Sequence, residues 1–343
     1  MWKTFLKWRN FRTAVLETSL ARASATGQRD IVVVPCWRRP DFLWHCLDNL
    51  ARNDEIGDVH VLYRVDTAYS EEILDVISSF GHRIPSYEIE FAIPSPFRRT
   101  KPSANFLFGM LHAAARASQF VFLVEEDIMV ARDYLRWNRA VHAAAGPLFC
   151  SIPVKNPNRD LELPADSAGY YLSSGDSCSN GMCFHKDILI DLVAPHFNMS
   201  YLRQPKKYIR RRFPRSEIGL GFVEQDGLIR RIQEQSSFPI AWPCVPRAFH
   251  SGFFGARGGW QKFGEQDSGT PLRERVRLLG DTIYNAEAMR KAIDRPEFLQ
   301  TCMPCELELP PWTQLHRVVV PAPTQGVTHQ ILDRLREHDV NGG

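Results

Sequence analysis

The chain has 343 residues, of which 44% are hydrophobic and 24% charged, so it has enough apolar material for a sizeable core. Its 21 glycines and 23 prolines are an ordinary share, which excludes collagen-like and wholly disordered classes. The formal net charge of +3 does not by itself indicate a nucleic-acid-binding protein. No apolar run approaches the roughly 18 residues of a membrane-spanning helix. The composition predicts a soluble, enzyme-sized globular protein.

The N-terminal segment, residues 1–29, is basic before its first acidic residue and lacks the features of a secretory signal. Its aromatic residues recur at every third position, which indicates a basic helix with a broad apolar side. Such a helix either packs on its own domain, which we favour, or rests on an anionic membrane surface. We therefore expect a cytoplasmic protein, with peripheral membrane contact left open, whose cysteines are reduced and mostly buried.

From residue 30 the chain alternates strand-like and helix-like segments. Apolar runs rich in β-branched residues predict strands over 30–36, 59–66, 87–93 and 119–127. Amphipathic segments predict helices that open at Pro40, after the N-cap candidate Ser70, and around 106–114. This βαβαβαβ order predicts an α/β fold with a mostly parallel sheet and right-handed crossovers. Further strands are expected over 148–154, 239–245 and 316–320, and further helices after Asp226 and over 273–294.

Three acidic residues, Glu125, Glu126 and Asp127, end the fourth predicted strand. Ligands of an open parallel sheet bind outside the carboxyl ends of its strands. Three adjacent acids are costly to bury there unless a cation or hydrogen-bond donors meet them. Mn²⁺ or Mg²⁺, held by one or two carboxylates and shared with a diphosphate, would meet that cost. The alternative is that the acids are solvated, with one of them capping a helix around 134–143.

The segment VEEDIMVARDYL resembles the acidic motif of the GT-A glycosyltransferases, and most closely that of the inverting N-acetylglucosaminyltransferase I group. The resemblance implies a GT-A (Rossmann-like) fold. It implies that Asp127 is the metal ligand and that Glu125 and Glu126 contact the ribose or the sugar of the donor. The segment PCWRRPDFLWHCLDNL resembles the first strand and helix of the family, which implies that Arg38 or Arg39 lies in the nucleotide pocket.

The resemblance extends to the nucleotide base and to the last strand of the sheet. Asp66 ends the second predicted strand, where the family has an acid that binds the base, often uracil, so a UDP-sugar is the favoured donor. The alternative for Asp66 is a turn-forming residue. His250 follows the last sheet strand, where the family implies a place in the metal shell or beside the diphosphate. Arg257 lies in a glycine-rich loop that could fold over the donor phosphates as a flap.

The segment GLGFVEQDGLIRR, residues 219–231, resembles the catalytic-base region of the same family. Asp226 matches the base, and Glu224 is the alternative because related groups begin this pattern with Glu-Asp. Gln225, which separates the two acids, departs from the family pattern. The structural alternative for Asp226 is the N-cap of the following helix, and one residue can hold both roles.

A basic run without any acid precedes this segment, over residues 203–215. Such a run usually forms a solvated or disordered face, but its position next to the presumed base suggests an anionic acceptor, such as a phospholipid, a lipid diphosphate or nucleic acid. Its basic residues are Arg203, Lys206, Lys207, Arg210, Arg211, Arg212 and Arg215.

We therefore predict a metal-dependent, inverting glycosyltransferase of hexosyl or N-acetylhexosaminyl type that uses a nucleoside-diphosphate sugar and a glycan, lipid-linked or other hydroxyl acceptor. The predicted catalytic domain spans 30–265, with a nucleotide-sugar half over 30–130 and an acceptor half over 131–265, followed by a helical and Pro-rich extension over 266–343. One alternative is a sugar-phosphate nucleotidyltransferase, which the absence of glycine after the first strand disfavours. The other is a non-catalytic basic module that binds nucleic acid or membrane.

Overall fold

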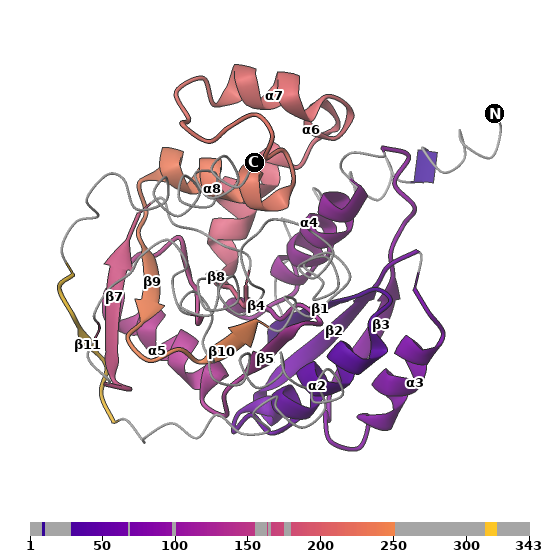
Figure 1. The fold of residues 1–343 in the computed structure, drawn as a ribbon, viewed down its shortest axis with the longest axis vertical. Helices are drawn as coiled ribbons and strands as arrows, with labels where there is room; N and C mark the ends of the chain where they lie inside the picture. Colours follow the sequence, from indigo (N-terminus) through magenta and orange to yellow (C-terminus); the bar gives the residue numbers. More distant parts are fainter. Residues whose placement is uncertain are drawn as a thin grey trace, which may run out of the picture.

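A computed structural model describes residues 9–10, 29–67, 69–97, 101–154, 163, 166–174, 180–250 and 313–320. Within this part, a nine-stranded mixed sheet is flanked by helices and accompanied by a two-stranded sheet (Figure 1). Most of the N-terminal segment, the glycine-rich loop that contains Arg257 and the helix expected over 273–294 lie outside the described residues.

Parallel strands form the first half of the large sheet in the order β4–β1–β2–β3. The inner strands are buried on both faces, which explains their continuous apolar sequences, whereas the edge strand β3 alternates between exposed and half-buried residues. The predicted α/β fold with a mostly parallel sheet is confirmed. The strands span β1 Asp30–Cys36, β2 Val59–Val65, β3 Tyr87–Phe91 and β4 Phe120–Leu123.

Three helices connect these strands. α2 (Pro40–Ala51) and α3 (Glu72–Ser79) pack on one side of the sheet, and α4 (Lys101–Ala114) packs on the other (Figure 1). Proline occupies the first position of α2 as predicted, because its fixed φ suits the first turn and the amide hydrogen it lacks has no partner there. The expected N-cap of α3 was wrong, since Glu71 and not Ser70 occupies that position.

The second half of the sheet mixes parallel and antiparallel strands in the order β11–β7–β9–β6–β8, and β8 joins it antiparallel to β4. The strands β7 and β8 fall in a stretch for which the sequence predicted none. The strands of this half are β6 Cys150–Ser151, β7 Gly169–Ser173, β8 Cys183–His185, β9 Ile240–Pro243 and β11 His316–Arg317.

The remaining elements are a small antiparallel sheet and further helices. The small sheet pairs β10 with β5, which is the strand that follows β4 in the chain. The elements are β5 Ile128–Val130, β10 Ala248–His250, α5 Tyr134–Ala145, α6 Met199–Arg203, α7 Pro205–Arg212 and α8 Gln225–Ser236, with short 3-10 and π-helical turns over Ile56–Asp58, Ile188–Val193 and Ala194–His196.

Residues from both halves of the sheet contribute to one large apolar core. The cysteines of the described part are buried free thiols, which confirms the expectation that they act as small apolar residues: Cys36, Cys46, Cys150, Cys183 and Cys244. None of the described helices has the length and apolar character required to span a bilayer.

Candidate active site

The carboxyl ends of β1 and β2 place predicted donor-site residues at one edge of the sheet. β1 ends at Cys36, and its backbone carbonyl accepts a hydrogen bond of 2.9 Å from the amide of Asp66, which directly follows β2. Arg38 and Arg39 follow β1 directly at this edge. Arg39 reaches the acidic cluster, whereas the guanidinium of Arg38 lies over the ring of Trp37, 5.8 Å from its centroid.

The acidic cluster forms the turn between β4 and β5. The predicted fourth strand is therefore too long, because β4 ends at Leu123. Glu126 accepts hydrogen bonds from the Trp37 amide at 2.7 Å and from Arg39 Nε at 2.6 Å, and Arg39 Nη1 lies 2.7 Å from Asp127 Oδ2. Glu126 and Asp127 are only 2% and 8% exposed, so the donors that the buried acids require come largely from the turn after β1.

These contacts affect the two buried carboxyl groups differently. Burial raises the pKa of Glu126, and the opposing effects of Arg39 and the Trp37 amide do not cancel it. For Asp127, burial is outweighed by His250 and Arg39, which together lower the pKa to about 2. Asp127 is therefore ionised at neutral pH, as a ligand of a hard cation must be.

Pairing of β10 with β5 brings His250 to the acidic turn. His250 lies opposite Ile128 in this antiparallel pair, and its Nε2 is 3.5 Å from Asp127 Oδ2. No set of three or more potential ligands gathers around one point in the described part of the chain. A carboxylate beside an imidazole nevertheless fits Mn²⁺ or Mg²⁺ shared with a diphosphate, because such ions usually keep waters and substrate phosphates as their other ligands.

Asp66 is held at the same edge through α4. The Asn105 side-chain amide lies 3.4 Å from Asp66 Oδ2, and its carbonyl oxygen accepts a hydrogen bond of 2.9 Å from Arg64 Nε. The Thr67 hydroxyl adds a contact of 3.2 Å to the other carboxylate oxygen. These bonds fix the half-buried carboxylate of Asp66 beside the end of β1.

Gln225 anchors the predicted base segment to α4. Its backbone amide donates to Ser103 Oγ at 3.0 Å, and the Ser103 hydroxyl donates back to Gln225 Oε1 at 2.8 Å. Ser103 is fully buried in the first turn of α4, which follows a parallel strand and therefore begins at the carboxyl edge of the sheet. Gln225, which separates the two candidate bases, is thus the residue that holds this segment in place.

The two candidate bases flank Gln225 and are both exposed. Glu224 occupies the N-cap position of α8, and Asp226 lies in its first turn, so the alternative of Asp226 as the N-cap was wrong. Burial raises the pKa of Tyr201, and the negative charges of Glu224 and Asp226 add to this effect.

Sequence reasoning missed the role of Arg231, which clamps the loop before α8. Its side chain is buried, and its guanidinium donates to four backbone carbonyls at 2.6–2.8 Å. An arginine about two turns into the helix that follows a glycine-rich loop is the sequence signal that could have revealed it. The carbonyls belong to Ile218, Gly219, Phe222 and Gly227.

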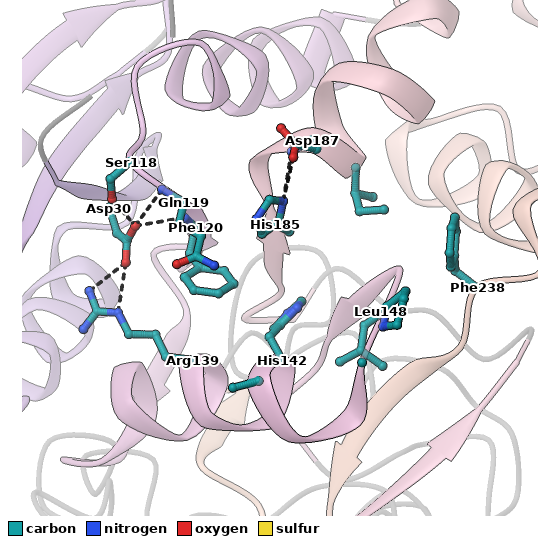
Figure 2. Close-up of a pocket in the computed structure, with 14 residues that line it drawn as sticks. Asp30, Ser118, Gln119, Phe120, Arg139, His142, Leu148, His185, Asp187 and Phe238 are labelled. Carbon is teal, nitrogen blue, oxygen red and sulfur yellow. Dashed lines mark hydrogen bonds and ion pairs between the residues drawn. The ribbon is translucent and has the colours of Figure 1, made fainter. Parts of the chain in front are cut away.

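A cavity of about 460 Å³ lies at the opposite edge of the sheet (Figure 2). It is lined by Asp30, the first residue of β1, and by His142 and His185. Asp30 accepts hydrogen bonds from Arg139 and from the residues that begin β4, so its charge is satisfied within the protein. None of the predicted site residues lines this cavity, and we assign its polar groups to structure.

Residues 29–178 match the family described as "Glycosyltransferase like family 2". This region contains the carboxyl ends of β1, β2 and β4, and with them Arg39, Asp66 and the acidic turn. It is less than half of the chain, and it gives no support to the N-acetylglucosaminyltransferase I group in particular. No curated protein matches the chain.

Solved structures give more distant likenesses. TarS 1–349 of S. aureus in complex with UDP-GlcNAc is 12% identical over 79% of this chain and 72% of that chain, with a TM-score of 0.43. The mannosyltransferase PcManGT of Pyrobaculum calidifontis, in complex with GDP-Man and Mn²⁺, is 15% identical over 87% of this chain and 78% of that chain, with a TM-score of 0.39. The match to a longer TarS chain covers 48% of this chain and 29% of that one.

Proposed function

We propose that this chain is a metal-dependent glycosyltransferase that uses a nucleoside-diphosphate sugar. The observation that carries the proposal is the buried Asp127 beside His250 at the carboxyl edge of the sheet, and Asp127 lies within the region that matches the glycosyltransferase family. Asp127 and His250 would hold Mn²⁺ or Mg²⁺. The bound ion would neutralise the charge that builds on the departing nucleoside diphosphate.

The donor would lie across the ends of β1 and β2. We assign Asp66 to the nucleotide base, with UDP as the favoured nucleotide, and Arg38 and Arg39 to the nucleotide pocket. Glu125 and Glu126 remain candidates for contacts to the ribose or the sugar. Because both oxygens of Glu126 accept bonds within the protein, we also assign it the positioning of Arg39 and of the turn after β1.

The acceptor hydroxyl would lose its proton to Asp226, or to Glu224, as its oxygen attacks the anomeric carbon. Both carboxylates are exposed, and Gln225 ties them to the carboxyl edge of the sheet, which supports either assignment. A single displacement with one base would invert the anomeric configuration. We propose a hexosyl or N-acetylhexosaminyl group as the sugar.

The nucleotidyltransferase alternative is disfavoured by the turn after β1. Such an enzyme is expected to cradle phosphates with glycine backbone amides there, but this turn reads Trp37–Arg38–Arg39 and α2 begins at once with Pro40. The site offers arginine side chains where that chemistry favours a glycine-rich loop.

The proposed function is tested by the release of nucleoside diphosphate from UDP- and GDP-sugars with added Mn²⁺. Wild-type release should fall on chelation of the metal and recover with Mn²⁺. Asp127→Asn, which keeps the size of the side chain, should lose activity roughly 100-fold or more because it removes the charge that faces the cation. Asp187→Asn, at the far edge of the sheet, should retain it.

Thermal unfolding of both variants separates loss of function from loss of fold. Wild-type-like release by a folded Asp127→Asn variant would reject the metal assignment. If no nucleotide sugar is bound or cleaved by the wild-type protein at any Mn²⁺ concentration, the glycosyltransferase assignment itself is wrong.

A further inference from the structure

The predicted basic run folds into a groove formed largely by α6 and α7. The groove encloses about 820 Å³. Arg203, Lys207, Arg211 and Arg212 line it, and all four are exposed. On α7 the exposed residues are all basic, and the residues beneath them are buried or half-buried. The run is therefore a structured cationic surface and not a disordered segment.

The charge of this groove is not compensated within the described part of the chain. The recorded ion pairs there join basic residues of other elements to acids, and none of them involves a basic residue of 203–215. Lys207 and Arg211 stand four positions apart on α7, where like charges repel and destabilise a helix. A bound anion would relieve this repulsion.

Hydrogen bonds hold residues that line the groove in fixed positions. Asn198 caps α6 by accepting hydrogen bonds of 3.1 Å from the amides of Ser200 and Tyr201. The Tyr208 hydroxyl lies 2.8 Å from His196 Nδ1 and 3.3 Å from Asn198 Nδ2, so the aromatic residue of the lining is bonded into the wall. A single-stranded nucleic-acid site stacks successive bases on several aromatic faces, whereas the lining of this groove contains one aromatic residue, the half-buried Tyr208.

The groove is also poorly suited to lie on a membrane. An interfacial helix inserts apolar side chains into the lipid boundary, but the apolar residues of α7, Pro205 and Ile209, are buried in the protein. The hollow shape and its four basic lining residues suit a discrete anionic group better than a flat surface.

α6 connects the groove to the candidate base. The Tyr201 hydroxyl of α6 donates a hydrogen bond of 2.8 Å to the backbone carbonyl of Val223, the residue before Glu224. Phe222, the residue before Val223, is 67% exposed and offers an apolar side chain two positions before Glu224. One short helix thus forms a wall of the groove and supports the segment that we assign to deprotonation of the acceptor.

We propose that this groove binds phosphate groups of the acceptor, so that the acceptor is a phosphate-bearing hydroxyl compound. Arginine and lysine recognise phosphate through charge-assisted hydrogen bonds, and four of them around one hollow match more than one phosphate charge. This inference rests on the proposed function, because it names the substrate class for which Glu224 or Asp226 would act as base.

The test uses the full chain with inorganic tripolyphosphate as the probe, in metal-free buffer, by isothermal titration. Lys207→Gln/Arg211→Gln should weaken binding roughly tenfold or more, since two phosphate contacts are lost, and binding should fall steeply with salt. The matched control is Lys206→Gln/Arg210→Gln, which removes equal charge from the same helix outside the groove lining and should change affinity little.

Other ligands and the donor are measured in parallel. Equal weakening by the two double variants would overturn the groove as the site. Tighter binding of anionic phosphatidylglycerol vesicles or of a DNA oligonucleotide, lost in the groove variant alone, would overturn a discrete phosphate-bearing acceptor in favour of a membrane surface or nucleic acid as the ligand of the groove. UDP-sugar binding with Mn²⁺ should be intact in both variants. If wild-type protein binds tripolyphosphate in the groove but no nucleotide sugar, the proposed function fails separately.

Discussion

Arg39 is the side chain around which the candidate donor site is organised. Its fork-shaped guanidinium reaches Glu126 with Nε and Asp127 with Nη1, which a lysine ammonium could not reproduce in one fixed geometry. The carboxylate of Glu126 accepts from both the Trp37 amide and Arg39. It therefore links the turn after β1 to the acidic turn that we propose as the metal site.

Two conservative substitutions, each of a single residue, distinguish the candidate bases. Asp226→Asn should lower kcat for transfer by about 10²–10⁴-fold, because the amide cannot accept the acceptor proton, while the Kd for the donor stays unchanged. Glu224→Gln should have a small effect. Transfer to a hydroxyl acceptor and donor titration give the two quantities. The reverse pattern would assign the base to Glu224.

The loop that precedes α8 is shaped as one unit by Gly227 and Arg231. The guanidinium of Arg231 donates hydrogen bonds to the backbone carbonyls of Phe222 and Gly227. The loop must therefore lie close to the first turn of α8. A β-carbon on Gly227 would lie 2.3 Å from the Phe222 carbonyl oxygen, which is backbone and cannot rotate away. The glycine is therefore needed for packing rather than for turn geometry.

Gly227→Ala should displace the loop that carries both candidate bases. We expect a loss of about 1–3 kcal/mol in the free energy of unfolding, the usual cost of overpacking, together with a lower kcat. Urea denaturation and transfer assays measure the two effects. Gly57→Ala is the control, since its added carbon meets nothing within 4 Å. Unchanged stability in Gly227→Ala would show that the loop packs less tightly than described.

Across the whole molecule, buried ionisable groups tie stability to pH. Burial lowers the pKa of His142 and of His196 from 6.5 to about 4, with Arg212 adding to the effect on His196. The two histidines sit in different places, one at the cavity of Figure 2 and the other beside α7. Both favour the neutral ring in the folded state.

The free energy of unfolding should therefore fall as the pH decreases from about 6.5 to about 4, since the unfolded chain takes up protons that the folded chain does not. The free energy of unfolding should fall a second time below about pH 4. There the Asp127 carboxyl becomes protonated in the unfolded chain but stays ionised in the folded protein down to about pH 2. Denaturant titrations between pH 7 and pH 3 measure both. A flat profile between 6.5 and 4 would contradict the burial of these histidines, and His142→Gln should make the profile shallower.

The parts of the fold that the sequence predicted are those with a local signal. Strands β1, β2 and β3 appeared within two residues of their expected ends because apolar runs between turn residues mark them. The missed strands β7 and β8 are short, and their partners β9 and β4 are distant in the chain, so no local pattern marks them.

In the candidate site, too, single residues could be predicted from local patterns, whereas contacts between distant segments could not. The resemblance singled out Asp127 and His250, but their approach depends on the pairing of β5 with β10, which no local pattern encodes. The choice between Arg38 and Arg39 was open for the same reason, because Arg39 and Asp127 are 88 positions apart. The role of Gln225 required knowledge that α8 meets the first turn of α4.

The first turns of α4 hold two parts of the candidate site at a fixed distance from each other. Ser103 holds the segment of the candidate bases, and Asn105, two positions along the same helix, holds the carboxylate assigned to the nucleotide. Under the proposed function, this one helix would set the distance between the nucleotide base of the donor and the base that activates the acceptor. A hybrid protein in which residues 131–265 come from a relative would also need the α4 of that relative. Without it, the two proposed substrate sites would not be aligned with each other.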